Sequence, residues 1–273
     1  MATGSSADPK SLSATHFWLN PPKRPKAIES LVLGVERYDP AQVQVLEDYL
    51  AQQFNEVFYD PLANLATLKL YQFNPDLVPL AAENPSNPIE AIHDSITIKI
   101  LMLSITHRPF DSDFSLGLSM CGDRMSNLVT PQATLNLVSL LSQLSSTLQS
   151  RRFPAFWKLI ASQDFEQLIP IIESIVDFDN LIRRSISKSV ASCFKSISTD
   201  RLQNYLGYTN VEQVNCWIKE IGWSLVDGKA RIPDNADNCP VTSIIRENTT
   251  LSGKLLVTNV IYSCWVFFCF YNH

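Results

Sequence analysis

Apolar residues recur at spacings of three and four along most of the chain, which is the pattern of amphipathic helices. One such stripe consists of Val43, Leu46, Leu50, Phe54 and Val57. The next segment, Pro61–Phe73, carries a single charge, and a helix that is apolar almost all round is expected to be buried between neighbours. Further helices are predicted at Ala91–His107, Phe114–Met125 and Pro131–Leu148.

Capping signals support these helices. Asp39-Pro40 and Asp60-Pro61 each put a capping carboxylate before a proline at the first helical position, and Thr130-Pro131 repeats the arrangement with a hydroxyl. Asn74-Pro75 is expected to end the helix that Asp60 begins. The proline-rich stretch Leu77–Pro88 reads as a loop.

The helix at Pro131–Leu148 has a leucine stripe and no charge. The stripe consists of Leu137, Leu141, Leu144 and Leu148. We expect neighbouring helices to cover this leucine stripe. The alternative is that a partner protein covers it. Successive helices of this length with short connections predict a HEAT-like stack of helix pairs, although no residue-level repeat is visible.

The C-terminal third predicts a different arrangement. A long helix at Asp177–Ile197 is followed by a short one opened by Ser198-Thr199 and closed by Gly207. Thr209–Glu212 fits a capping box for a third helix. Asp227-Gly228 then separates two short alternating segments, which indicates a β-hairpin. Three helices and a hairpin in this order predict a winged helix.

The charges of this winged helix argue against sequence-specific binding to duplex nucleic acid. The third helix carries Glu212, Lys219 and Glu220, whereas a helix inserted between phosphates needs a positive surface. The whole chain of 273 residues has a net charge of −5. A protein partner is therefore the preferred interpretation, and a nucleic-acid binder remains a weaker alternative.

No motif for catalysis, cofactor binding or metal binding is found. The chain has 8 glycines and no phosphate-binding loop, and its six cysteines form no C-x-x-C pair. We expect these thiols to be reduced and buried. His93 and His107 bracket one predicted helix, and Asp177 and Asp179 sit at a helix start, where acids are common for electrostatic reasons alone. We therefore predict no enzyme activity, no catalytic residue, no cofactor and no metal.

Three segments carry a resemblance to a known family. They are YDPLANLATLKLYQFNP at Tyr59–Pro75, FPAFWKLI at Phe153–Ile160 and VNCWIKEIGWS at Val214–Ser224. In order and spacing they resemble the subunit K family of eukaryotic translation initiation factor 3, and the resemblance covers Lys26–Leu256. It implies a helical-repeat domain followed by a winged helix of the PCI type.

The resemblance also implies a function. It implies a non-catalytic scaffold subunit in the cytoplasm that contacts other subunits of the factor, especially subunit L, and supports assembly on the small ribosomal subunit. A small PCI subunit of the proteasome lid or the signalosome is the near alternative. Sequence-specific nucleic acid, a small-molecule substrate and a membrane are not expected as partners.

The predicted organisation has four parts. They are a disordered extension at 1–24, the helical-repeat domain at 25–176, the winged helix at 177–235 and a tail at 236–273. The end of the tail, Val257–His273, is uncharged, aromatic and without a family counterpart. This segment could be a membrane anchor or a buried segment that closes the helical stack. We prefer a third interpretation, an atypical terminus without a structural role.

Overall fold

The fold is described from a computed structural model that covers residues 21, 23–83, 85–86, 88–125 and 131–239. The chain divides into two units, Met1–Asn238 and Cys239–His273, and the first contains every element named below. Nearly all of the predicted extension at 1–24 and of the predicted tail at 236–273 lies outside the described residues. The division at residue 176 into two domains stays a prediction.

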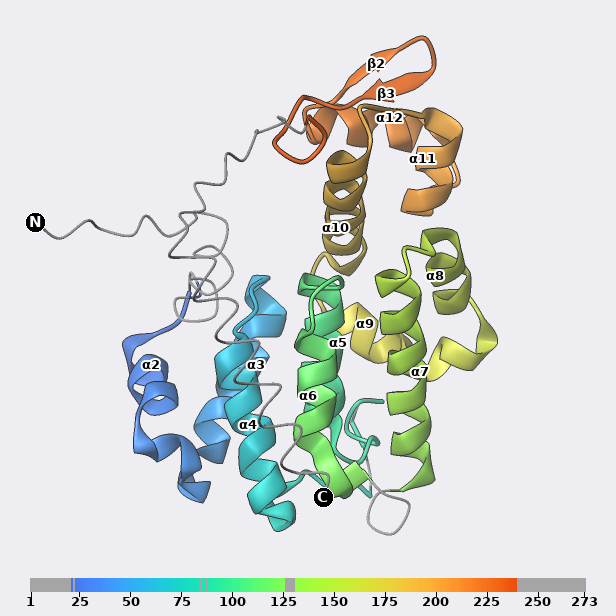
Figure 1. The fold of residues 1–273 in the computed structure, drawn as a ribbon. Helices are drawn as coiled ribbons and strands as arrows, with labels where there is room; N and C mark the ends of the chain where they lie inside the picture. Colours follow the sequence, from blue (N-terminus) through green and yellow to red (C-terminus); the bar gives the residue numbers. More distant parts are fainter. Residues whose placement is uncertain (1–20, 22, 84, 87, 126–130, 240–273) are drawn as a thin grey trace, which may run out of the picture. The chain divides into compact units, whose positions relative to one another are not determined.

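The first part of the chain forms a stack of helices, of which α3 to α7 lie side by side (Figure 1). The α-helices are α2 (Lys26–Leu33), α3 (Val43–Glu56), α4 (Pro61–Phe73), α5 (Ser95–His107), α6 (Asp113–Cys121), α7 (Gln132–Gln149), α8 (Phe153–Ile160) and α9 (Ile169–Ser174). Short 3-10 helices lie between them: η1 (Val35–Tyr38), η2 (Pro40–Gln42), η3 (Pro75–Leu77), η4 (Gly122–Met125) and η5 (Gln163–Leu168).

Local capping explains why α4 has the predicted bounds. The Asp60 carboxylate accepts a hydrogen bond from the backbone N–H of Ala63 at 3.1 Å, and Pro61 occupies the first helical position. Asp39 caps the short helix η2 before α3 in the same way, through the N–H of Ala41. Asn74 ends α4, as predicted.

Three helix starts and ends differ from the predictions. Asp94, with φ +58°, caps α5, so this helix begins at Ser95 and not at Ala91. The helix predicted to run to Met125 becomes a 3-10 helix after Cys121, at Gly122 with φ +50°. Pro131 is the N-cap residue of α7 and not its first helical residue. In each case a local capping or backbone conformation overrides the apolar periodicity.

The chain then forms the winged helix. Its elements are α10 (Phe178–Cys193), β1 (Ser196–Ser198), α11 (Thr199–Leu206), α12 (Val211–Glu220), β2 (Ser224–Val226) and β3 (Lys229–Arg231). The three strands form an antiparallel sheet in the order β1-β3-β2, with Ile197 and Leu225 both paired to Ala230. The fold class predicted from sequence, mainly helical with a small hairpin, is confirmed.

Two local predictions in the winged helix were wrong. The predicted helix ended at Ile197, but α10 stops at Cys193 and Ile197 lies in strand β1, where it pairs with β3. The cap of α12 is Asn210, whose side chain accepts a hydrogen bond from the N–H of Glu212, and not Thr209. The predicted turn is present, with φ of 51° at Asp227 and 70° at Gly228.

The core is continuous through the helices and the winged helix. One cluster of buried apolar side chains extends from Leu50 to Ile232, and the leucine stripe of α7 belongs to it. Neighbouring helices therefore cover that stripe, as first expected. A second cluster joins α2, α3 and α4 through residues such as Val32, Leu46 and Leu70.

Candidate protein-interaction site

The outer strand of the winged helix exposes apolar side chains. β2 is an edge strand because β3 pairs on one side of it only, and all three of its residues are exposed. Leu225 is 46% exposed and Val226 40% exposed. An edge strand offers unpaired backbone N–H and C=O groups as well as side chains to another chain. We call Ser224–Val226 the wing edge.

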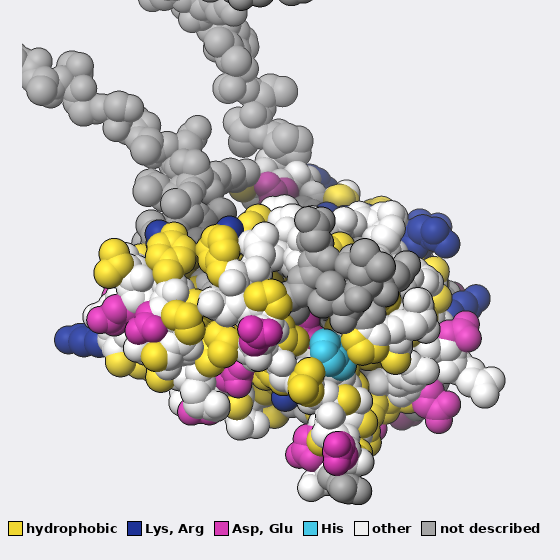
Figure 2. Space-filling view, turned by 90° about the horizontal axis from the view of Figure 1, so that it is seen from below, with side chains coloured by type: hydrophobic (Ala, Val, Ile, Leu, Met, Phe, Trp, Pro, Cys, Tyr) yellow, Lys and Arg dark blue, Asp and Glu magenta, His cyan; other side chains and the backbone are white. Residues whose placement is uncertain are grey.

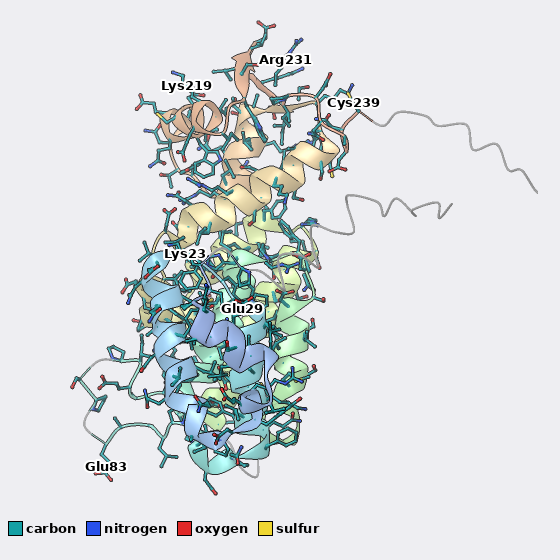
Figure 3. All side chains as sticks on the ribbon, turned by 90° about the vertical axis from the view of Figure 1, so that its left-hand side faces the viewer. Lys23, Glu29, Glu83, Lys219, Arg231 and Cys239 are labelled. Atoms are coloured by element: carbon teal, nitrogen blue, oxygen red, sulfur yellow. The ribbon has the colours of Figure 1, made fainter. Side chains whose placement is uncertain are left out.

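The electrostatics of the winged helix favour a protein over a phosphate backbone. Residues 177–238 contain equal numbers of basic and acidic side chains, eight of each. The exposed residues of α12 include Glu212, Lys219 and Glu220, and Glu220 forms an ion pair with Arg184 at 3.0 Å. Nucleic-acid binding depends on an excess of cations, which this helix lacks. Figure 3 labels Lys219 and Arg231, both in the winged helix.

An aromatic contact fixes the winged helix against the helical stack. The indole N–H of Trp157 in α8 donates to the carbonyl of Tyr205 in α11 at 2.9 Å. Gly207, with φ +67°, lies so close to the indole that a Cβ there would come within 2.6 Å of it. The guanidinium of Arg183 lies over the rings of Trp157 and Tyr208. These contacts hold α10 and α11 of the winged helix against α8.

A buried polar network organises the corner between α3 and α4. Arg24 forms two hydrogen bonds of 2.7 Å with the Asp60 carboxylate, and their side chains are 3% and 0% exposed. The Tyr49 hydroxyl donates to the same carboxylate at 3.1 Å, while Gln53 accepts from the Asp60 N–H and exchanges amide hydrogen bonds with Asn64. This network makes Asp60 structural. Arg24, predicted to lie in a disordered extension, is part of the folded unit.

The structure places the two histidines singled out from sequence in different surroundings. Burial lowers the pKa of His107 to about 4, and its ring stacks on Tyr59 with centroids 5.8 Å apart. A neutral imidazole against an aromatic ring is a packing arrangement. The backbone carbonyl of His93 accepts a hydrogen bond from Thr134. The two histidines thus have different surroundings and different neighbours.

The paired carboxylates at the start of α10 have local partners. Asp177 accepts a hydrogen bond from the Asn180 side chain at 2.6 Å, and Asp179 pairs with Arg183 at 3.1 Å. Both contacts join residues three or four apart, as expected at a helix start. Within the described residues no group of three or more His, Cys, Asp or Glu side chains could hold a metal ion.

The cysteines differ from the expectation, whereas the tryptophans among the described residues all pack on the core. Trp217 is buried and donates to the Ser187 hydroxyl at 3.0 Å, but Trp157 and Trp223 are only half-buried against the core. Cys121 is buried, whereas Cys193 and Cys216 are exposed, which corrects the expectation of buried thiols. Cys216 faces outward because its neighbours on α12, Val214, Trp217 and Ile218, take the core-facing positions.

The apolar end of the chain, Val257–His273, lies outside the described residues. Among the helices that the structure describes, none is both long and apolar enough to span a bilayer.

Comparison with known proteins gives one consistent result. Residues 91–241, which contain α5 to β3, match the CSN8/PSMD8/EIF3K family. A protein of Mycosarcoma maydis named eukaryotic translation initiation factor 3 subunit K is 32% identical, over 86% of this chain and 90% of that protein. The chain belongs to the family of initiation factor 3 subunit K. A Neurospora crassa subunit K is also 32% identical, over 90% of this chain and 97% of its own, and one from Sclerotinia sclerotiorum is 30% identical, over 84% and 91%.

The three segments that resemble the subunit K family have identifiable structural roles. Tyr59–Pro75 contains Asp60 and the whole of α4. Phe153–Ile160 is α8, whose Trp157 contacts the winged helix, and Val214–Ser224 contains most of α12. The three segments thus form α4, α8 and most of α12, and α8 also contacts the winged helix. No site residues were predicted from the sequence. The wing edge could not be predicted, because the exposure of a strand depends on the order in which the strands of the sheet pair.

Proposed function

We propose that this chain is a non-catalytic scaffold subunit of eukaryotic translation initiation factor 3. It acts in the cytoplasm, binds other subunits of the factor, especially subunit L, and thereby supports assembly of the initiation complex on the small ribosomal subunit. The similarity to proteins named subunit K over most of both chains carries this proposal. In this role the subunit needs no cofactor, and its contact with the ribosome is indirect.

The wing edge is the surface that we assign to docking. Its apolar side chains and free backbone groups suit a partner strand laid beside β2, and its neutral surroundings disfavour phosphate. The contacts of Trp157 with Tyr205 and Gly207 support this assignment because they join the winged helix to the helical stack.

Affinity purification of the tagged full-length chain from its own cells tests the proposal. We expect initiation factor 3 subunits to co-purify, with subunit L among the most abundant. Recovery with proteasome-lid or signalosome subunits instead would assign the alternative membership, and recovery of a free monomer would refute the scaffold role. A binding titration with duplex DNA should show no sequence preference.

A pair of substitutions tests the wing edge itself. Leu225→Asp with Val226→Asp should strongly reduce recovery of the other subunits, because two carboxylates would enter an apolar contact. Val45→Asp with Val176→Asp is the matched control, since it also adds two carboxylates at exposed valines, 43% and 48% exposed, outside the sheet. Thermal melts should confirm that both variants fold. Equal recovery with both variants would exclude the wing edge as the docking surface.

A further inference from the structure

A small apolar pocket lies on the helical stack, outside the wing edge. It opens between α2, η1, α4 and α6 and has a volume of about 200 Å³. Its walls are Val32, Arg37, Tyr38, Leu62, Leu65, Ala66, Lys69 and Met120. Figure 3 is turned so that α2, which carries one wall of the pocket, faces the viewer. We call this hollow the α2–α4 pocket.

Two cations at the α2–α4 pocket have no acidic partner. The Nε atom of Arg37 is buried and lacks a hydrogen-bond acceptor. The Lys69 ammonium bonds only to the neutral side chain of Gln72, at 3.1 Å. In the part of the chain that the structure describes, no carboxylate lies within 4 Å of either cation.

Aromatic rings extend the apolar surface beyond the pocket. The Arg37 guanidinium lies 4.8 Å from the ring centroid of Tyr38, and the Lys69 ammonium lies 4.7 Å from that of Phe73. Tyr38 is 49% exposed and Phe73 60% exposed. Large apolar side chains left in water beside a hollow mark an interaction surface. Figure 2 shows the lower face of the molecule, where hydrophobic side chains gather with single Asp and Glu side chains between them.

We propose that the α2–α4 pocket binds a short segment of a partner protein in which a bulky aliphatic side chain is flanked by Asp or Glu. The volume suits one side chain, since sites for small molecules start at about 300 Å³. The apolar walls bind that side chain, and the flanking carboxylates pair with the positive charges of Arg37 and Lys69. This surface lies on elements other than the wing edge, so the proposal goes beyond the function proposed above.

The choice of an acidic segment follows from charge complementarity. A basic segment would meet two unpaired cations at the pocket, and like charges brought together at an interface are strongly disfavoured. A neutral apolar segment would remove water from around Arg37 and Lys69 without offering either cation a counter-charge, which carries a desolvation penalty. A carboxylate beside the apolar side chain satisfies both requirements.

Fluorescence anisotropy with the full-length chain tests the proposal. The probe is a labelled peptide of about 14 residues, or four helical turns, with leucine at helical spacing and glutamate elsewhere. The comparison peptide replaces each glutamate by lysine. We expect the acidic peptide to bind at least about tenfold more tightly than the basic one, and its binding to weaken as salt rises from about 50 to 300 mM.

Charge reversal at the pocket gives the decisive comparison. Arg37→Glu with Lys69→Glu should weaken binding of the acidic peptide about tenfold or more, because two attractions become two repulsions. The matched control is Lys158→Glu with Lys219→Glu, which changes the net charge equally at exposed positions on α8 and α12 and should leave binding unchanged. Lys69→Glu alone replaces the double variant if the latter does not fold.

Three results would overturn the proposal. The first is equal binding of the acidic and basic peptides to the native chain, and the second is an absence of measurable binding of the acidic peptide. The third is an equal loss of binding in the pocket variant and in its control. None of these results bears on recovery with initiation factor 3 through the wing edge, so the two proposals fail separately.

Discussion

Replacing Asp60 by Asn tests the buried network at the corner of α3 and α4. The substitution keeps the shape of the side chain and its capping ability, since Asn caps helices as well as Asp does. It removes the negative charge that faces the Arg24 guanidinium at 2.7 Å, where both side chains are almost completely buried. The variant therefore measures the joint effect of the buried charge and of the lost acceptor with little change in packing.

The expected loss is large because a buried cation would lose its counter-charge. Removing one partner of a buried ion pair lowers the free energy of unfolding by about 3–5 kcal/mol. In a folded unit of this size each kcal/mol shifts the melting temperature by roughly 2–4 °C, so Asp60→Asn should melt about 6–20 °C lower. The substitution also replaces one carboxylate acceptor by an amide donor, although Oδ2 of Asp60 accepts from both Arg24 at 2.7 Å and Tyr49 at 3.1 Å, and this loss acts in the same direction.

Urea unfolding of the full-length chain, followed by circular dichroism, measures this effect. A double-mutant cycle with Arg24→Met should give a coupling energy of about 1–3 kcal/mol, because the double variant leaves no unpaired charge. Lys23→Met is the matched control, since its ion pair with Glu56 is about half exposed and should contribute about 1 kcal/mol or less. A loss below about 1 kcal/mol for Asp60→Asn, or additive effects in the cycle, would refute the reasoning.

Other predictions concern the junction and the buried histidine. Gly207→Ala should destabilise the chain by about 1–2 kcal/mol more than Gly222→Ala, because both glycines have positive φ but only Gly207 would place a Cβ against Trp157. The excess should vanish in a Trp157→Ala background, and equal costs in the native chain would contradict the contact. Because burial lowers the pKa of His107 to about 4, stability should fall as pH drops from 6.5 towards 4, by up to about 3 kcal/mol. Unfolding curves of His107→Phe across this range should lack that loss, and an unchanged pH profile would exclude His107 as its source.

The amino-acid sequence by itself determined most of the helices. The bounds of α4 were predicted correctly because its start and its end depend on residues within one turn, Asp60 and Asn74. The hairpin turn at Asp227-Gly228 was equally predictable, since positive φ at both positions is a local preference of these residues. The order of three helices and a hairpin then indicated the winged helix.

Only the tertiary structure decided the features that depend on distant partners. Strand β1 exists because Ile197 pairs with Ala230 on β3, and its three residues carry no strand pattern of their own. The sequence around Arg24 predicts a polar extension, but Arg24 is buried because it pairs with Asp60, 36 residues away. The exposure of Leu225 and the unpaired state of Arg37 also depend on which elements pack beside them. Capping and turn preferences act within a few residues, whereas burial and pairing are decided by the whole packed chain.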